Sequence, residues 1–571
     1  MKIKLLLLLL FYSCLTQSQD ILWEKSYGGL HADYLFDAQP TADYGFILAG
    51  SSLSEKTGNK TENNHGDLDY WVWKMNEKGD LDWQKSLGGS GFDLLQSIKN
   101  TKDGGFILAG TSNSSPASTS SASEKGGTMG DKKENCKGIT DFWVIKLNAK
   151  GEEQWQKTIG GSGQDELLCA FQTKDGGYML GGSSSSTVNN DNFNGNSNFN
   201  SDGSENKGFD GKPDLAGKTE KCRGNMDYWI VKLDNTGAVQ WQKTYGGEYA
   251  DVLRSMEQTT DGGYIMGGYS NSSRSGDKTE ANNGIGDYWI LKIDNLGKIE
   301  WQKTYGGNGD NQLYVIHQTK DGGYIAGGNS NSTTPLTLMG GNVSSGTDYW
   351  VLKMNEKGEV VWSKTYDFGK VDILTSMVEN EDHTFLIGGY AQSESDQGIK
   401  GGLQLKVSGD KEGINDYIAL KISDTGEELW KKTVGSKGED ILRKLIETRD
   451  GGYLLAGTSN SKSSQDKNST IGGNDFWVVK LKDKQKPEEI KAHIEAIPNP
   501  VRTFTNIIVG YDFEQGTASL YDITGRQLQH FEIGSRTVPI DLSNYPEGVY
   551  VVSIKTNVRT DGVKLIKASN K

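Results

Sequence analysis

The stretch DYWILKIDNLGKIEWQKTYGG, residues 287–307, decides the fold because near-copies of it recur along most of the chain. Each copy has a Trp two residues before a Lys, and a constant interval leads from this Trp to a DGG[YF] turn, which is degenerate in two copies. The seven tryptophans are Trp23, Trp83, Trp155, Trp241, Trp301, Trp362 and Trp430. A catalytic motif normally occurs once, so a phrase in seven copies indicates a repeat architecture.

Each repeat predicts four short strands. The segments DLLQSIKN and GGFILAGTS flank the turn TKDGG, and DYWVWKMN and DLDWQKSL flank EKG, where Gly supplies the positive φ of short hairpins. Strands rich in Trp, Tyr, Val and Ile suit a sheet that is covered on both faces. We therefore predict an all-β chain whose residues 20–481 form a seven-bladed β-propeller with four-stranded blades.

Two features of the repeats predict how the ring is built. The array opens with a lone strand, ILWEKSYGG from Ile21, and ends on DFWVVKLKD from Asp475, so the N-terminal strand should complete the last blade and leave no open edge. The interval from the DGG turn to the next D[YF]W motif is the one that varies widely in length. Insertions at one point of a repeat place the variable loops on one face of the ring.

The composition changes after the last repeat. Residues 482–495 are charged and carry no strand pattern, which predicts a linker, and residues 496–571 alternate short strands with turns. This second segment predicts a small immunoglobulin-like β-sandwich.

The C-terminal segment resembles a known family. The motifs PNP, LYDITGR, IDLSNYPEGVYVVSI and KLIK are similar in order and position to the type A C-terminal sorting domain of the type IX secretion system. The matching residues are Pro498, Asn499, Pro500, Gly525, Gly548, Tyr550 and Lys564. The resemblance implies a Bacteroidetes-type bacterium, the type IX secretion machinery as a partner, and a product that is secreted or held on the outer-membrane surface. The repeats also resemble secreted DGGY/DYW-repeat propellers, a likeness that implies no particular activity.

The N-terminus predicts export as well. Residues 1–19 place Lys2 and Lys4 before the apolar run LLLLLLFYSCL, which is typical of a cleaved signal peptide leading to the periplasm. Cys14 offers the alternative of a lipid anchor. The mature chain contains no apolar stretch long enough for a transmembrane segment, and a net charge of −14 argues against a nucleic-acid partner.

An acidic residue or its amide opens the first strand of every blade. These residues are Asp33, Asp93, Asp165, Asp251, Asn311, Asp372 and Asp440. One interpretation is a ring at one mouth of the central channel that binds a cation or another ligand. The other is that each side chain accepts hydrogen bonds from backbone N–H groups of its own Gly-rich turn.

The loops offer further candidates for metal binding. In the recurrent segment GDKTEANNGIGD, Asp277 and Glu280 are candidate calcium ligands, and the Asn-rich insert from Asn189 partly matches a calcium-loop spacing. Calcium is the one cofactor that this composition suggests, and the predicted function requires none.

The cysteines suggest a cross-link. Cys136 and Cys222 each lie five residues before a D[YF]W motif in adjacent blades, where other copies carry Asn64 and Asn282, and they form a candidate disulfide in an exported chain. Cys169 is predicted to be a small buried residue.

Three functions fit this sequence. The favoured one is a secreted or cell-surface binding protein that recognises a glycan or a protein through the variable loops. The alternative is an extracellular polysaccharide hydrolase or lyase, although neither H-E-x-x-H nor G-x-S-x-G occurs. A quinone-dependent dehydrogenase is the third, since DTGEELW, residues 424–430, resembles a tryptophan-docking repeat shortened by one residue.

Overall fold

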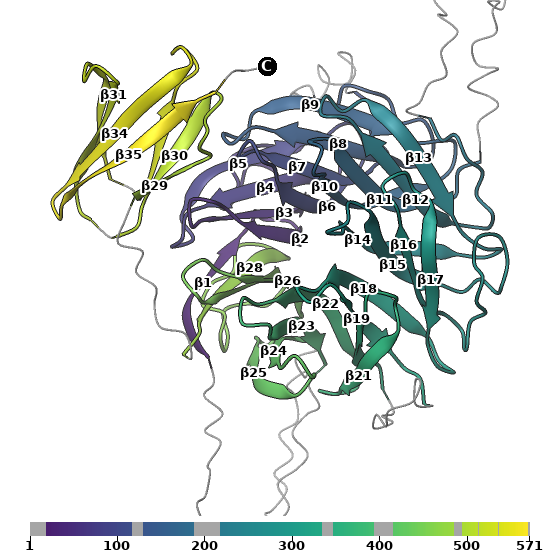
Figure 1. Ribbon diagram of the computed structural model, residues 1–571. Coiled ribbons are helices and arrows are strands. Elements are labelled where there is room, and N and C mark those ends of the chain that lie inside the picture. Colours follow the sequence, from purple (N-terminus) through teal and green to yellow (C-terminus); the bar gives the residue numbers. More distant parts are fainter. Residues whose placement is uncertain are drawn as a thin grey trace, which may run out of the picture.

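The chain forms a closed ring of β-sheets with a smaller β-domain at its side (Figure 1). The computed structural model describes residues 19–116, 130–187, 217–333, 346–392, 415–484, 494–511, 513–534 and 536–568. All helix and strand elements in these ranges are β-strands, and seven four-stranded sheets make up the ring. The predicted fold class, a seven-bladed propeller followed by a small β-domain, is confirmed. Within the same ranges no helix could cross a membrane.

The blades follow one another along the chain, and each runs from the centre outward. Blade one is β2 (Asp33–Pro40), β3 (Phe46–Ser52), β4 (Asp69–Met75) and β5 (Leu81–Leu87). Blade two is β6 (Asp93–Asn100), β7 (Phe106–Ser112), β8 (Asp141–Leu147) and β9 (Glu153–Ile159). Blade three is β10 (Asp165–Gln172), β11 (Tyr178–Ser184), β12 (Asp227–Leu233) and β13 (Val239–Tyr245). Blade four is β14 (Asp251–Gln258), β15 (Tyr264–Ser270), β16 (Asp287–Ile293) and β17 (Ile299–Tyr305).

The last three blades complete the circle. Blade five is β18 (Asn311–Gln318), β19 (Tyr324–Ser330), β20 (Asp348–Met354) and β21 (Val360–Tyr366). Blade six is β22 (Asp372–Glu379), β23 (Phe385–Ala391), β24 (Asp416–Ile422) and β25 (Glu428–Val434). Blade seven is β26 (Asp440–Glu447), β27 (Tyr453–Ser459) and β28 (Asp475–Lys482), with β1 (Asp20–Tyr27) as its outer strand. β1 pairs antiparallel with β28, for example Lys25 with Val478, which confirms the predicted closure.

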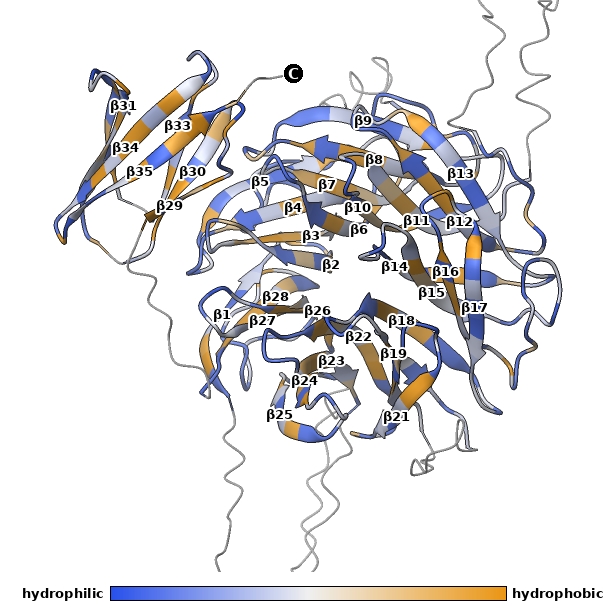
Figure 2. Ribbon diagram, viewed as in Figure 1, coloured by the Kyte–Doolittle hydropathy of each residue, from blue (hydrophilic) through white to orange (hydrophobic). Residues whose placement is uncertain are grey.

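Hydrophobic residues concentrate in the two middle strands of each blade. Every residue of β3, β4, β7 and β8 is buried, whereas in the outer strands β5 and β9 the buried residues lie toward the C-terminal end. Figure 2 shows the hydropathy of the residues along these strands. A strand buried on both faces requires the continuous apolar pattern seen in the sequence. The core therefore lies between neighbouring blades rather than inside any single blade.

Aromatic side chains join each blade to the next. The hydroxyl of Tyr228 in β12 donates to the carbonyl of Trp289 in β16 at 2.9 Å, and their ring centroids are 4.9 Å apart. On the outer strands, Trp155 packs over Gly237, a turn glycine of the following blade with φ of 85°. These repeated residues are thus explained by packing between blades.

The ring has two distinct faces. The turn face carries the DGG turns and the short turns between third and fourth strands. The loop face carries the long connections between second and third strands, together with the segments that lead from one blade to the next.

The C-terminal domain is a sandwich of two sheets. The first contains β29 (Ile494–Ile497), β30 (Phe504–Val509) and β33 (Thr537–Asp541). The second contains β31 (Gly516–Asp522), β32 (Gln527–Ile533), β34 (Gly548–Thr556) and β35 (Thr560–Lys567). The domain contacts the turn face of the ring, where Arg536 lies 3.1 Å from Glu77 and Arg449 lies 3.0 Å from Glu495.

Candidate functional site

The residues that open the first strands are buried near the loop face. This inner row consists of Asp33, Asp93, Asp165, Asp251, Asn311, Asp372 and Asp440, and each is 0 % exposed. In blade one, the backbone N–H of Gly29 and the hydroxyl of Ser54 donate to Oδ2 of Asp33 at 2.7 and 3.1 Å. The six aspartates accept a backbone N–H of the turn that precedes their strand, whereas Oδ1 of Asn311 accepts the hydroxyls of Ser330 and Ser332. None of the seven side chains is exposed to the channel.

A second acidic row faces the first across the blade junctions. This partner row opens the third strands and consists of Asp69, Asp141, Asp227, Asp287, Asp348, Asp416 and Asp475. At one junction Nδ2 of Asn311 donates to Oδ1 of Asp287 at 3.0 Å. Elsewhere an aspartate stands in place of this asparagine, so two carboxylates meet.

The paired carboxylates favour their protonated forms. Burial, followed by the charge of Asp93, raises the pKa of Asp69 to about 7. Burial and the charge of Asp251 raise the pKa of Asp227 to about 6. Oδ1 of Asp69 and of Asp227 is buried without a hydrogen-bond partner. These two oxygens therefore lack a hydrogen-bond donor, which favours a proton bound to the carboxyl group.

Buried lysines offset part of this negative charge. They lie in the loops between second and third strands and are Lys60, Lys132, Lys218, Lys278 and Lys467. Burial lowers the pKa of Lys60 to about 8, against the charges of Asp33 and Asp69, which raise it. Its Nζ also donates to the carbonyl of Ser54 at 2.5 Å. Each lysine thus belongs to the scaffold of its blade.

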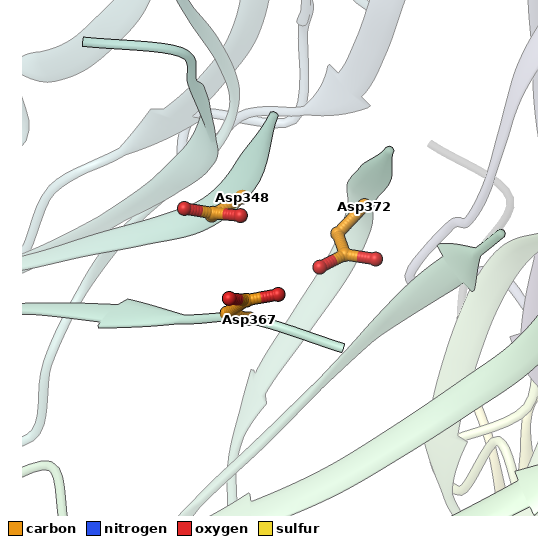
Figure 3. A group of neighbouring side chains, drawn as sticks. All are labelled: Asp348, Asp367 and Asp372. Atoms are coloured by element: carbon orange, nitrogen blue, oxygen red, sulfur yellow. The ribbon is translucent and has the colours of Figure 1, made fainter. Parts of the chain in front are cut away.

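The junction between blades five and six differs from the others. Asp348 of β20, Asp372 of β22 and Asp367, which follows β21, bring carboxylate oxygens within 4.8 Å of one another (Figure 3). Asp348 and Asp372 are buried, whereas Asp367 is exposed. Burial raises the pKa of Asp372 to about 7, with further contributions from the charges of Asp348 and Asp367. Among the described residues this is the one group of three acidic, His or Cys side chains with such spacing.

Asp277 and Glu280 point to different partners. Oδ2 of Asp277 lies 2.7 Å from Nε of Arg223, on the loop of the preceding blade. Oε2 of Glu280 accepts the N–H of Thr304 in β17 at 2.6 Å. Both carboxylates therefore hold the loop in place, and neither belongs to the three-carboxylate group. The Asn-rich insert from Asn189 lies outside the described residues.

The structure does not contain the predicted disulfide, because Cys136 and Cys222 are free thiols. Sγ of Cys136 donates to the carbonyl of Ser112 at 3.5 Å, and Sγ of Cys222 donates to that of Ser184 at 2.9 Å. Nδ2 of Asn282 donates in the same way to Ser270 in blade four. Each cysteine thus replaces the asparagine as a donor within its own blade. Cys169 is buried, as expected from the sequence.

The turn face carries a cleft of about 670 Å³ between blades five and six. Its lining includes Asp321, Lys353, Trp362 and His383. Nζ of Lys353 lies 2.8 Å from Asp321, and Nε1 of Trp362 donates to the carbonyl of Asp424. The ammonium group of Lys353 and the indole N–H of Trp362 are thus each paired with another group of the cleft lining.

In the C-terminal domain, the motif residues hold strands together. The side chain of Asn499 donates to the carbonyl of Lys564 at 2.7 Å and accepts the N–H of Ile566 at 2.9 Å. Gly525 has a φ of 83° in the turn after β31, and the hydroxyl of Tyr550 donates to the carbonyl of Pro546. The motif residues Pro498 and Pro500 lie in the connection between β29 and β30, and Gly548 is the first residue of β34.

Residues 495–568 match the secretion system C-terminal sorting domain. The sorting domain implies export of the chain, contact with the secretion machinery, and a secreted or cell-surface location. The match covers β29 to β35 and does not extend to the propeller.

Comparisons of the whole chain identify distant structural likeness. No curated protein matches the sequence. The structure of YCF48 bound to D1 peptide is 7 % identical, with a TM-score of 0.37, and the alignment covers 83 % of this chain and 100 % of that one. Sqt1 from Chaetomium thermophilum is 10 % identical, with a TM-score of 0.36, covering 85 % and 97 %. A point mutant of NanB sialidase from Streptococcus pneumoniae is 9 % identical, with a TM-score of 0.36, covering 81 % and 70 %. Likeness of this size carries no information about function.

Two features of the site were not predicted from the sequence. The partner row was identified in the sequence only as the start of each D[YF]W motif, without a role in the site. Its spacing from the inner row of the next blade is nevertheless the same at six junctions along the chain. Asp367 was also missed, even though the pair Asp367 and Phe368 stands where five other repeats have Gly-Gly after the outer strand. Both features stand out as columns in an alignment of the seven repeats.

Proposed function

We propose that this exported propeller is a binding protein that recognises a glycan or a protein through its loop face. The observation that carries the proposal is that the repeats vary in length at one connection, and that this connection lies on the loop face in every blade. A scaffold that keeps its strands constant and varies its loops is typical of a recognition surface.

The opposite face supports this assignment. The sorting domain contacts the turn face at blades one, two and seven, through the pairs Arg536–Glu77, Lys150–Asp541 and Arg449–Glu495. A ligand site on the loop face would remain accessible whether the sorting domain is present or removed.

Loop exchange tests the proposal. In the full chain, residues 113–140 of blade two are replaced by residues 271–286, the shorter loop that joins the same two strands in blade four. The retention of each protein on immobilised polysaccharides and surface proteins is measured, together with the release of reducing ends from the polysaccharides. A His383→Ala variant on the turn face is the matched control.

We expect the exchange, but not the control, to reduce retention of one ligand class, without release of fragments. New reducing ends would instead assign a polysaccharide-degrading activity. Retention that survives exchange of every long loop would contradict a binding site on the loop face.

A further inference from the structure

We propose that Asp348, Asp367 and Asp372 bind one calcium ion at the junction of blades five and six. The three carboxylates come from a third strand, a connecting segment and a first strand, and they face a common space (Figure 3). This site does not depend on the loop-face ligand proposed above, because its three residues lie in and next to the strands of two neighbouring blades.

The first argument is steric. Six of the seven repeats have glycine at the position of Asp367, namely Gly28, Gly88, Gly160, Gly246, Gly306 and Gly435. A Cβ added to Gly88 or Gly306 would collide with Oδ1 of the neighbouring partner-row aspartate. Blade five places a whole carboxylate where the other junctions leave no room for a methyl group. A third acidic group beside two buried ones is unfavourable unless a cation lies between them.

The second argument is the loss of hydrogen-bond donors around Asp372. In the other six blades the residue that pairs with the inner-row side chain is a serine, such as Ser330, which donates to Oδ1 of Asn311 at 2.6 Å. Blade six has Ala391 there. Oδ2 of Asp372 accepts the N–H groups of Phe368 and Gly369, and its Oδ1, like Oδ1 of the other inner-row aspartates, is buried without a hydrogen-bond partner. At Asp372 alone among the described residues, two further carboxylates share this space (Figure 3).

The third argument is charge. In five blades the loop between the second and third strands supplies a buried lysine, for example Lys60 beside Asp33 and Asp69. The corresponding sequence of blade five, residues 331–347, contains neither Lys nor Arg. The junction therefore gains the negative charge of Asp367 and lacks the lysine that this loop supplies in five other blades, and both changes favour a bound cation.

The ligand set selects the class of cation. Three carboxylates and no His or Cys favour a hard ion with oxygen ligands. Calcium accepts six to eight oxygens in flexible geometry, so water can complete the shell on the side of the exposed Asp367. Calcium sites of extracellular modules have dissociation constants of about 10⁻⁴ to 10⁻³ M, which suits an exported protein.

The test compares calcium binding in the full chain and in two variants that restore the pattern of the other junctions. Asp367→Gly returns the glycine of the repeat, and Asp372→Asn returns the Asn–Asp pair seen at Asn311 and Asp287. Asp277→Asn, in the ordered loop of blade four, is the matched control. After treatment with a chelator, each protein is titrated with calcium alone and with magnesium alone by calorimetry, and its Tm is recorded with and without calcium.

We expect the parent and the Asp277→Asn control to bind one calcium ion and to rise in Tm with calcium. Both junction variants should lose the heat of binding and the rise in Tm, while remaining folded without the ion. Equal heats of calcium binding for the parent and the Asp367→Gly variant would overturn the proposal. So would a parent protein whose Tm is the same with calcium and with chelator. Binding of magnesium in place of calcium would overturn the choice of ion.

Discussion

At the scale of single residues, Asn311 shows what the other blade junctions lack. Its amide donates to Asp287, whereas Asp93 presents a second carboxylate to Asp69. The pKa of Asp69 is raised to about 7, above its ordinary value of 3.8. A raised carboxyl pKa means that the stability contributed by the bound proton is full below about pH 4 and is lost as the pH rises through 7.

We therefore predict that Asp93→Asn stabilises the propeller at pH 8 and much less at pH 5. The amide would replace the shared proton with a permanent donor, for a gain of about 1 to 2 kcal/mol at pH 8. Urea unfolding at both values measures the effect. The reverse change, Asn311→Asp, should destabilise the protein at pH 8. Equal shifts at both pH values would contradict this account of the junctions.

The cysteines permit a second prediction at this scale. Because Cys136 and Cys222 each donate within their own blade, the unfolded, unreduced protein expressed from residue 20 onward should titrate three thiols per chain, including Cys169. A count of one would show that the two loops rearrange to form a disulfide. Cys136→Asn, which restores the side chain found in blade four, should leave the Tm within about 1 °C because the same carbonyl keeps a donor.

At the scale of strands, β1 closes the ring by completing blade seven. It covers the edge of β28 and supplies Glu24, which accepts the indole N–H of Trp477 at 2.8 Å. Removal of residues 20–27 should lower the Tm by more than about 10 °C and promote dimers, because an uncovered edge pairs with another chain. Scanning calorimetry and sedimentation measure both effects. A monomer with unchanged Tm would show that blade seven is stable with three strands.

The positions of the strands could be predicted from the sequence, and the chemistry of the junctions could not. Constant spacing places Asp33 and Asp69 at the starts of strands, since each repeat keeps the same register. Which carboxylates meet depends on the contact between blades, and Asp69 faces Asp93 of the next repeat rather than a residue of its own. For the same reason, the sequence of a single repeat does not predict that Asp367 lies close to both Asp348 and Asp372.

At the scale of the whole molecule, one irregular turn joins the propeller to its sorting domain. Tyr44 stands where the DGG turns have glycine, with a φ of 64°. Its ring lies between Arg449 of blade seven, 4.5 Å from the centroid, and Arg536 of the sorting domain, at 5.5 Å. The positive φ of a tyrosine destabilises the folded state by about 1 kcal/mol, and the contacts of the ring with two cations offset this cost.

Tyr44→Gly should therefore release the sorting domain without harming the ring. We expect a Tm of the propeller that is unchanged or higher, a larger radius of gyration in small-angle X-ray scattering, and faster proteolysis between β28 and β29. His383→Gly makes the same change in blade six, where φ is also 64°, and should leave the radius of gyration unaltered. No expansion of the Tyr44→Gly variant would show that the remaining contacts suffice to dock the domain.

The pairing of β1 with β28 also sets an order of events in time. The first strand to leave the ribosome must wait for the last strand of the ring, so the ring cannot close blade by blade during synthesis. Contacts so distant along the chain make folding slow. The sorting domain begins only after β28, so a chain that stops early lacks both its closing partner and its export signal. Because the sorting domain follows the last strand of the ring, only a chain that contains all the strands of the ring also carries the sorting domain.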